Sequence, residues 1–184
     1  MLNGNREQRI QGLRIFCEYR DQRSFPLLLP LLDQPCPVER MSAVYALGRN
    51  PCPSAVQKLV SLLKTDDNAY VRRATAWSLA NYDNQIVLEP LINALKNDVA
   101  AVRLWSSSSL AEIGNVSFEN AQLAAEQLLI SLKIDNESGV RSNCIWSLRR
   151  LYENLSNSIQ EIFIDECTKI ALFDKEPSVM EEAK

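Results

Sequence analysis

Aromatic and arginine side chains recur at matching places along this sequence. Tyr45, Trp77 and Trp146 occupy the same position of a recurring nine-residue phrase, and Ser108 takes that position in a further copy. Aromatic rings anchor partner proteins, and arginines bind carboxylates through paired hydrogen bonds. The chemistry that these residue types predict is binding.

Several kinds of catalytic site are excluded by composition. The chain of 184 residues has no histidine, which removes the usual proton shuttle and the commonest metal ligand. Its five cysteines are scattered, and its five glycines form no phosphate-binding loop. We therefore expect no metal site and no permanently bound cofactor, and these residues identify no catalytic side chain.

Charge and hydropathy limit the expected partners and location. The net charge is −3 and the pI is near 5.2, whereas general nucleic-acid binding needs a clustered basic excess. The polar N-terminal stretch MLNGNREQR and the absence of a bilayer-spanning apolar window argue against a membrane protein. Unpaired cysteines suit a reducing compartment, so we expect a cytoplasmic protein without nucleic-acid or membrane binding.

A repeat organises the chain. The phrases ERMSAVYAL (39–47), VRRATAWSL (71–79), VRLWSSSSL (102–110) and VRSNCIWSL (140–148) align on their final leucine, and QRIQGLRIF (8–16) is a fainter copy. Arginine always stands second, at residues 9, 40, 72, 103 and 141, and the clear copies follow acidic turns. We interpret these arginines as a ladder of charge-assisted hydrogen bonds between successive repeats, rather than as ligand-binding residues.

A second apolar segment separates each phrase from the next. The segments 25–33, 55–67, 86–98, 124–135 and 161–174 have apolar residues at three- and four-residue spacing, which predicts helices. Neither helix of a pair can bury its apolar face alone, so the pairs must stack. We predict an all-α fold, an α-solenoid of about five helix-turn-helix repeats in a single domain, 1–184. The predicted repeats are 5–33, 38–67, 70–98, 101–135 and 139–174, with a partial one at 178–184.

The serine run is predicted to be core rather than linker. Ser106 and Ser109 fall on the same helix face as Leu110, the last residue of the phrase. The other clear copies also have small residues at the positions of these two serines. The aromatic position lies on the opposite, outward face. Large aromatics there indicate an interaction surface, although packing across a tight groove is the alternative. The candidate binding residues are Tyr45, Arg49, Arg73, Trp77, Asn81, Trp105, Ser108, Trp146 and Arg150, with Glu112 in the same row.

The stretch VRRATAWSLANYDNQIVLEPLINALKNDVAAVRLWSSSSLAEIG resembles the HEAT-like repeat of the phycobilisome lyases. The similarity is good over residues 38–115 and weaker on both sides. Ala80 and Arg149 stand where the family pattern has glycine, and Met180 replaces the last arginine.

The resemblance implies a smaller-partner phycobilin lyase subunit or a phycobiliprotein chaperone associated with phycobilisomes. Its partners would be a phycobiliprotein subunit and a second HEAT-like lyase subunit, and its transient ligand an open-chain bilin. On that hypothesis Tyr45, Trp77, Trp105 and Trp146 wall a concave groove. Arg49, Arg73 and Arg150 hold propionates, Ser108 leaves room, and Glu112 acts as an acid or counter-ion to a pyrrole nitrogen.

A second hypothesis needs no tetrapyrrole. The same aromatic and arginine residues would serve a non-catalytic adaptor or scaffold that holds a partner's helix, including one that acts in phycobilisome disassembly.

Overall fold

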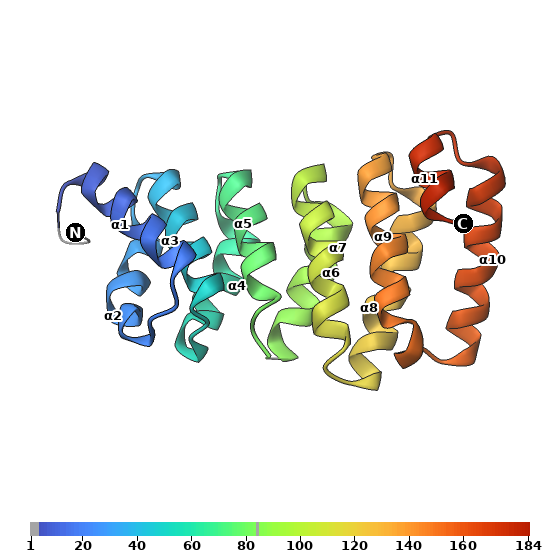
Figure 1. Ribbon diagram of the computed structural model, residues 1–184, viewed down its shortest axis with the longest axis horizontal. Coiled ribbons are helices and arrows are strands. Elements are labelled where there is room, and N and C mark those ends of the chain that lie inside the picture. Colours follow the sequence, from blue (N-terminus) through green and yellow to red (C-terminus); the bar gives the residue numbers. More distant parts are fainter. Residues whose placement is uncertain (1–3, 84) are drawn as a thin grey trace. The chain divides into compact units, whose positions relative to one another are not determined.

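Helices make up the regular structure of the chain. The computed structural model describes residues 4–83 and 85–184, and no strand occurs within them. Contacts divide the chain into two compact units, Met1–Pro90 and Leu91–Lys184, which are described separately below. Figure 1 shows the order of the helices along the chain.

Unit 1 has two layers. Helices α1 (Arg6–Glu18), α3 (Pro37–Arg49) and α5 (Ala69–Leu79) pack in that order as one layer (Figure 1). The other layer holds α2 (Phe25–Leu28) and α4 (Val56–Thr65), with the 3₁₀ turns η1 (Gln22–Ser24), η2 (Leu29–Asp33) and η3 (Pro53–Ala55). η4 (Gln85–Val87) also lies in this unit, and α6 (Leu88–Asn97) begins in it.

Unit 2 repeats the arrangement. Helices α7 (Ala100–Gly114), α9 (Ser138–Leu151) and the short α11 (Pro177–Glu182) pack in sequence. Helices α8 (Phe118–Ile134) and α10 (Asn157–Phe173) contact each other in the second layer, and η5 (Tyr152–Asn154) precedes α10. The expected all-α solenoid of helix-turn-helix repeats is confirmed.

Local sequence accounts for the helix ends. Asn5 and Gln8 form a capping box at α1, and the Asn68 side chain accepts hydrogen bonds from the amides of Tyr70 and Val71 at α5. Pro37 begins α3, where its missing amide donor costs nothing.

One expected helix is interrupted. Residues 25–33 form a single turn of α-helix followed by the 3₁₀ turn η2, rather than one continuous helix. Pro30 supplies no amide hydrogen to continue the α-helical bonding pattern, which explains the break.

The repeated leucines and serines form the core. Leu47, Leu79, Leu110 and Leu148 are fully buried, as are Ser106 and Ser107, and Ser109 is nearly so. The interpretation of the serine run as core is confirmed. Among the described residues, no helix is both long enough and apolar enough to cross a membrane.

Candidate partner-binding surfaces

Several of the repeated arginines donate hydrogen bonds to two different turns of the chain. Arg141 donates from Nε and Nη2 to the two carboxylate oxygens of Asp174, at 2.9 and 2.7 Å. Its Nη1 donates to the backbone carbonyl of Asp135, in the preceding turn, at 2.9 Å. The same paired contact to a carboxylate joins Arg40 to Asp66 and Arg103 to Asp135.

The arginine ladder predicted between successive repeats is confirmed by the carbonyl contacts, whereas each carboxylate contact lies within one repeat, contrary to the prediction. The turn before each arginine supplies a backbone carbonyl, whereas the carboxylate comes from the turn after it. Arg40, Arg103 and Arg141 thus need a carboxylate at the end of the next helix, whereas Arg9 pairs with Glu39 in the first turn of α3. The guanidinium groups of these arginines donate to carboxylates and carbonyls of the chain itself, so we interpret the ladder as structural.

Burial and hydrogen bonding oppose each other at the ladder aspartates. The Arg141 hydrogen bond lowers the pKa of Asp174, and burial only partly offsets it. At Asp66 and Asp135 burial is the largest influence and would raise the pKa, but hydrogen bonds from arginine and from a backbone amide outweigh it. All three carboxyl groups therefore have lowered pKa values and stay ionised at neutral pH.

Four of the predicted binding residues meet on α3 and α5 in unit 1. We call Tyr45, Arg49, Arg73 and Trp77 the Trp77 cluster. The Tyr45 and Trp77 rings lie 5.3 Å apart at 54°, and the Arg49 guanidinium lies 5.5 Å from the Trp77 ring centroid. Arg73 Nη2 donates to the Tyr45 hydroxyl at 3.4 Å.

Two features set the position and the chemistry of this cluster. A Cβ atom at Gly48 would lie 2.5 Å from Trp77 Cζ3, so glycine at that place lets the indole lie against α3. The Nε atom of Arg73 is buried and donates to no atom of the described chain. The cluster therefore places two aromatic rings beside two arginine guanidinium groups.

Four further predicted residues meet on α7 and α9 in unit 2. We call Ser108, Glu112, Trp146 and Arg150 the Trp146 cluster. The Arg150 guanidinium lies 5.1 Å from the Trp146 ring centroid, and its Nη2 pairs with Glu112 Oε1 at 2.9 Å. Trp146 is 41% exposed, so its indole is not sealed between the helix layers.

A small hollow adjoins the Trp146 cluster. Its volume is about 280 Å³, and Ser108 and Trp146 line it together with Asn143 and Glu182. The Asn143 amide donates to the hydroxyl of Ser108 at 2.7 Å. Sequence reasoning missed Asn143 and Glu182. The signal for Asn143 was its register, because it holds the same phrase position as Trp105.

The remaining predicted residues have less direct roles. Asn81 donates from its side-chain amide to the carbonyls of Trp77 and Ser78, so it closes the end of α5. Trp105 is half-buried on α7. The structure thus gathers most of the predicted residues into one cluster in each unit, and a single groove joining the two clusters stays a prediction.

Burial disfavours the thiolate form of three cysteines. Burial raises the pKa of the Cys144 thiol, and it raises those of Cys17 and Cys167 despite nearby arginines. Among the described residues, no group of three or more cysteine and acidic side chains is arranged to hold a metal ion. The arrangement is suited to binding through rings, arginines and amides.

Comparison with known proteins places the chain among repeat proteins. The pattern of HEAT repeats matches residues 2–80 and 56–149. No curated protein matches the sequence significantly.

Three solved structures with a similar fold are about 20% identical to this chain in sequence. The complex of CpcE and CpcF of phycocyanin lyase from Nostoc sp. PCC7120 matches with a TM-score of 0.66 and 21% identity, over 89% of this chain and 97% of that one. A designed armadillo repeat protein in complex with the peptide (KR)4 matches with a TM-score of 0.70 and 19% identity, over 99% and 93%. An engineered protein gives a TM-score of 0.70 at 20% identity, over 99% and 92%. These similarities show the solenoid fold alone.

Proposed function

Since this chain belongs to the HEAT-repeat family, we propose that it binds a partner protein through the Trp77 and Trp146 clusters. The Tyr45 and Trp77 rings beside the Arg49 and Arg73 guanidinium groups are the observation that carries this proposal. The exposed Arg49 guanidinium can bind a partner carboxylate through paired hydrogen bonds. Aromatic rings next to arginine are also the residue types that dominate protein interfaces.

For the partner we propose a phycobiliprotein subunit, with this chain acting as a phycobilin lyase subunit or chaperone. The resemblance of the repeat phrase and the fold similarity to the CpcE–CpcF complex support this choice. A bilin is a conjugated plate with two propionates. Tyr45 and Trp77 would stack on the plate, and Arg49 and Arg73 would bind its carboxylates.

In this proposal the chain positions the reactants. The attacking thiol belongs to the phycobiliprotein, so the chain would contribute orientation and proximity. Glu112 would serve as counter-ion to a pyrrole nitrogen only after exchanging its present contact with Arg150. A second HEAT-like subunit would complete the lyase.

A titration of the purified protein with a phycobilin, followed by visible absorption, tests this proposal. Binding of an extended bilin should shift and sharpen the visible band, and Trp77→Ala should weaken binding by about tenfold. Arg73→Gln should also weaken it while leaving the indole packing intact. Phe118→Ala is the matched control, because Phe118 is exposed and lies outside both clusters.

The result that overturns the bilin proposal is an unchanged spectrum, or equal affinity of wild type and Trp77→Ala. Far-UV circular dichroism of each variant verifies that the helices are intact. Co-expression with phycobiliprotein subunits and a bilin source, with a zinc-fluorescence gel, would then show whether attachment depends on this chain.

A scaffold without a tetrapyrrole is the second candidate. The pairing of Glu112 with Arg150 favours it, because that contact presents both charges beside Trp146, as a protein-binding surface does. In that case the spectrum stays unchanged, whereas binding to a bilin-free phycobiliprotein subunit depends on Trp77 and Trp146.

A further inference from the structure

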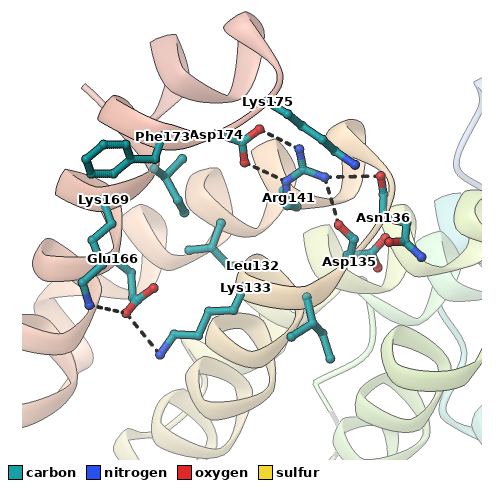
Figure 2. A pocket seen from close by; sticks show the side chains of 12 residues that line it. Leu132, Lys133, Asp135, Asn136, Arg141, Glu166, Lys169, Phe173, Asp174 and Lys175 are labelled. Atoms are coloured by element: carbon teal, nitrogen blue, oxygen red, sulfur yellow. Dashed lines mark hydrogen bonds and ion pairs between the residues drawn. The ribbon is translucent and has the colours of Figure 1, made fainter.

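A separate hollow lies in unit 2, at the C-terminal ends of α8 and α10. Its volume is about 440 Å³, and none of its lining residues belongs to the Trp77 or Trp146 cluster. Figure 2 shows Phe173 at one side, Leu132 at the floor, and the lysines Lys133, Lys169 and Lys175 around it. Ile134, the last residue of α8, also lines it.

The repeats provide an internal comparison for this hollow. The residue before the aspartate that ends each second helix is Leu32 in the first repeat, where it is buried in the core. The next two repeats have exposed polar residues there, Thr65 and Asn97. At the hollow the same position holds Ile134 and Phe173, which are 72% and 81% exposed. Because the repeat folds with a polar residue at this exposed position, folding does not require the isoleucine and the phenylalanine.

The preceding turn of α8 shows the same change. Four residues before Thr65 and Asn97 stand the exposed polar residues Ser61 and Asn93, whereas four residues before Ile134 stands Ile130, which is also exposed. Residues four apart share a helix face. The last two turns of this face of α8 are therefore apolar where those of α4 and α6 are polar.

The acidic groups of the hollow are buried, whereas its lysines are exposed. The carboxylates of Asp135 and Asp174 are buried and bound by ladder arginines. Lys133 and Lys169 both contact Glu166, which is mostly buried, at 3.3 and 3.0 Å (Figure 2). Lys169 also contacts Asp165, beyond the lining. The lysines are the exposed members, and Lys175 reaches the rim, so the solvent side of the hollow is cationic in a chain whose net charge is −3.

We propose that this hollow binds an acidic protein segment that inserts an apolar side chain between Ile134 and Phe173. The apolar side chain covers the two exposed residues, and flanking carboxylates pair with Lys133 and Lys175. This binding surface is additional to the Trp77 and Trp146 clusters and does not depend on the bilin proposal. A segment with basic flanks would place like charges against the lysines and be rejected.

The test is fluorescence anisotropy of the full-length protein with a fluorescein-labelled synthetic peptide that alternates leucine with glutamate. The expected Kd is about 100 μM, with binding that weakens as salt is added. The double substitution Ile134→Thr and Phe173→Asn, which copies the residue types of Thr65 and Asn97, should weaken binding by about tenfold. Lys175→Glu should weaken it and reduce its salt dependence.

The matched control is Ile164→Thr, because Ile164 is an exposed apolar residue of α10 outside the lining of this hollow. That variant should bind the peptide as the wild type does. Equal binding of a leucine–lysine peptide, an unaffected double variant, or no binding of the acidic peptide would overturn the proposal. A dimer of the free protein that the double substitution separates would also overturn it, since the occupant would then be a second copy of the chain.

Discussion

Asp66 serves two neighbouring arginines through different atoms. Its carboxylate accepts paired hydrogen bonds from Arg40 at 2.7 and 2.8 Å, and its backbone carbonyl accepts one from Arg72 at 2.7 Å. The carboxylate also accepts from the amide of Asn68, which shapes the turn into α5. A single buried residue therefore fixes the end of one repeat and the beginning of the next.

Substitution of Asp66 should be costly. Asp66→Ala leaves the mostly buried Arg40 guanidinium without its anion, and we expect the free energy of unfolding to fall by about 3 kcal/mol. Urea denaturation followed by circular dichroism measures this loss. Glu181→Ala removes an exposed ion pair with Lys184 and should cost much less, because water screens that pair. Similar losses in the two variants would contradict a structural role for the ladder.

At the scale of elements, the approach of α3 to α5 depends on Gly48. This glycine follows the last leucine of its repeat phrase. A Cβ there would also lie 3.2 Å from the backbone Cα of Ser78, which has no freedom to turn aside. The family pattern's glycine therefore has a packing reason in this repeat, and α3 and α5 bring Tyr45 and Trp77 together because of it.

Gly48→Ala should separate α3 from α5 and lower the free energy of unfolding by about 2 kcal/mol. Near-UV circular dichroism should report the altered setting of Trp77, with urea denaturation giving the loss. Gly139→Ala is the control, since its Cβ would meet only Leu104, at an ordinary 3.4 Å. That substitution should leave stability unchanged or raise it by about 0.5 kcal/mol through helix propensity. The interpretation fails if Gly48→Ala is as well tolerated as Gly139→Ala.

The sequence predicted elements well where spacing determines them. Apolar residues at three- and four-residue intervals located the helices, and recurring arginines after acidic turns predicted the ladder. The change from α-helix to 3₁₀ turn near Pro30 and the forward reach of Arg40, Arg103 and Arg141 were not predicted, because they depend on backbone geometry within a turn.

The candidate surfaces were predictable in part. A shared position in the repeat identified Tyr45, Trp77, Trp146 and the neighbouring arginines, but not that Glu112 pairs with Arg150. The hollow beside Ile134 and Phe173 was missed because the search for outward residues covered only the first helix of each repeat. Alignment of the second helices would have found both residues.

At the scale of the whole molecule, ladder carboxylates are present in both units. The pKa values of Asp66, Asp135 and Asp174 all lie below their ordinary value of 3.8. Groups with lowered folded-state pKa values contribute stability that is complete above the ordinary value and disappears as the pH falls through the folded value. The ladder therefore makes stability sensitive to acid in each unit.

The urea midpoint of unfolding should change little between about pH 7 and pH 5 and fall as the pH drops below about 4. Tryptophan fluorescence follows unfolding across this range. Asp66→Ala, which has already lost one ladder carboxylate, should lose less stability over the acid interval than the wild type does. Parallel losses in the two proteins would show that Asp66 titrates alike in the folded and unfolded chain.

Because the ladder arginines contact both the preceding and the following turn, they affect how the number of repeats in such a chain can change. Arg40, Arg103 and Arg141 each take a carbonyl from the preceding turn and a carboxylate from the following one. Each of the three repeats that hold these arginines therefore carries both the arginine and the aspartate of this contact. If a gene rearrangement duplicated or removed one whole repeat, the flanking repeats would meet with matching groups, and the copy number could vary without compensating substitutions.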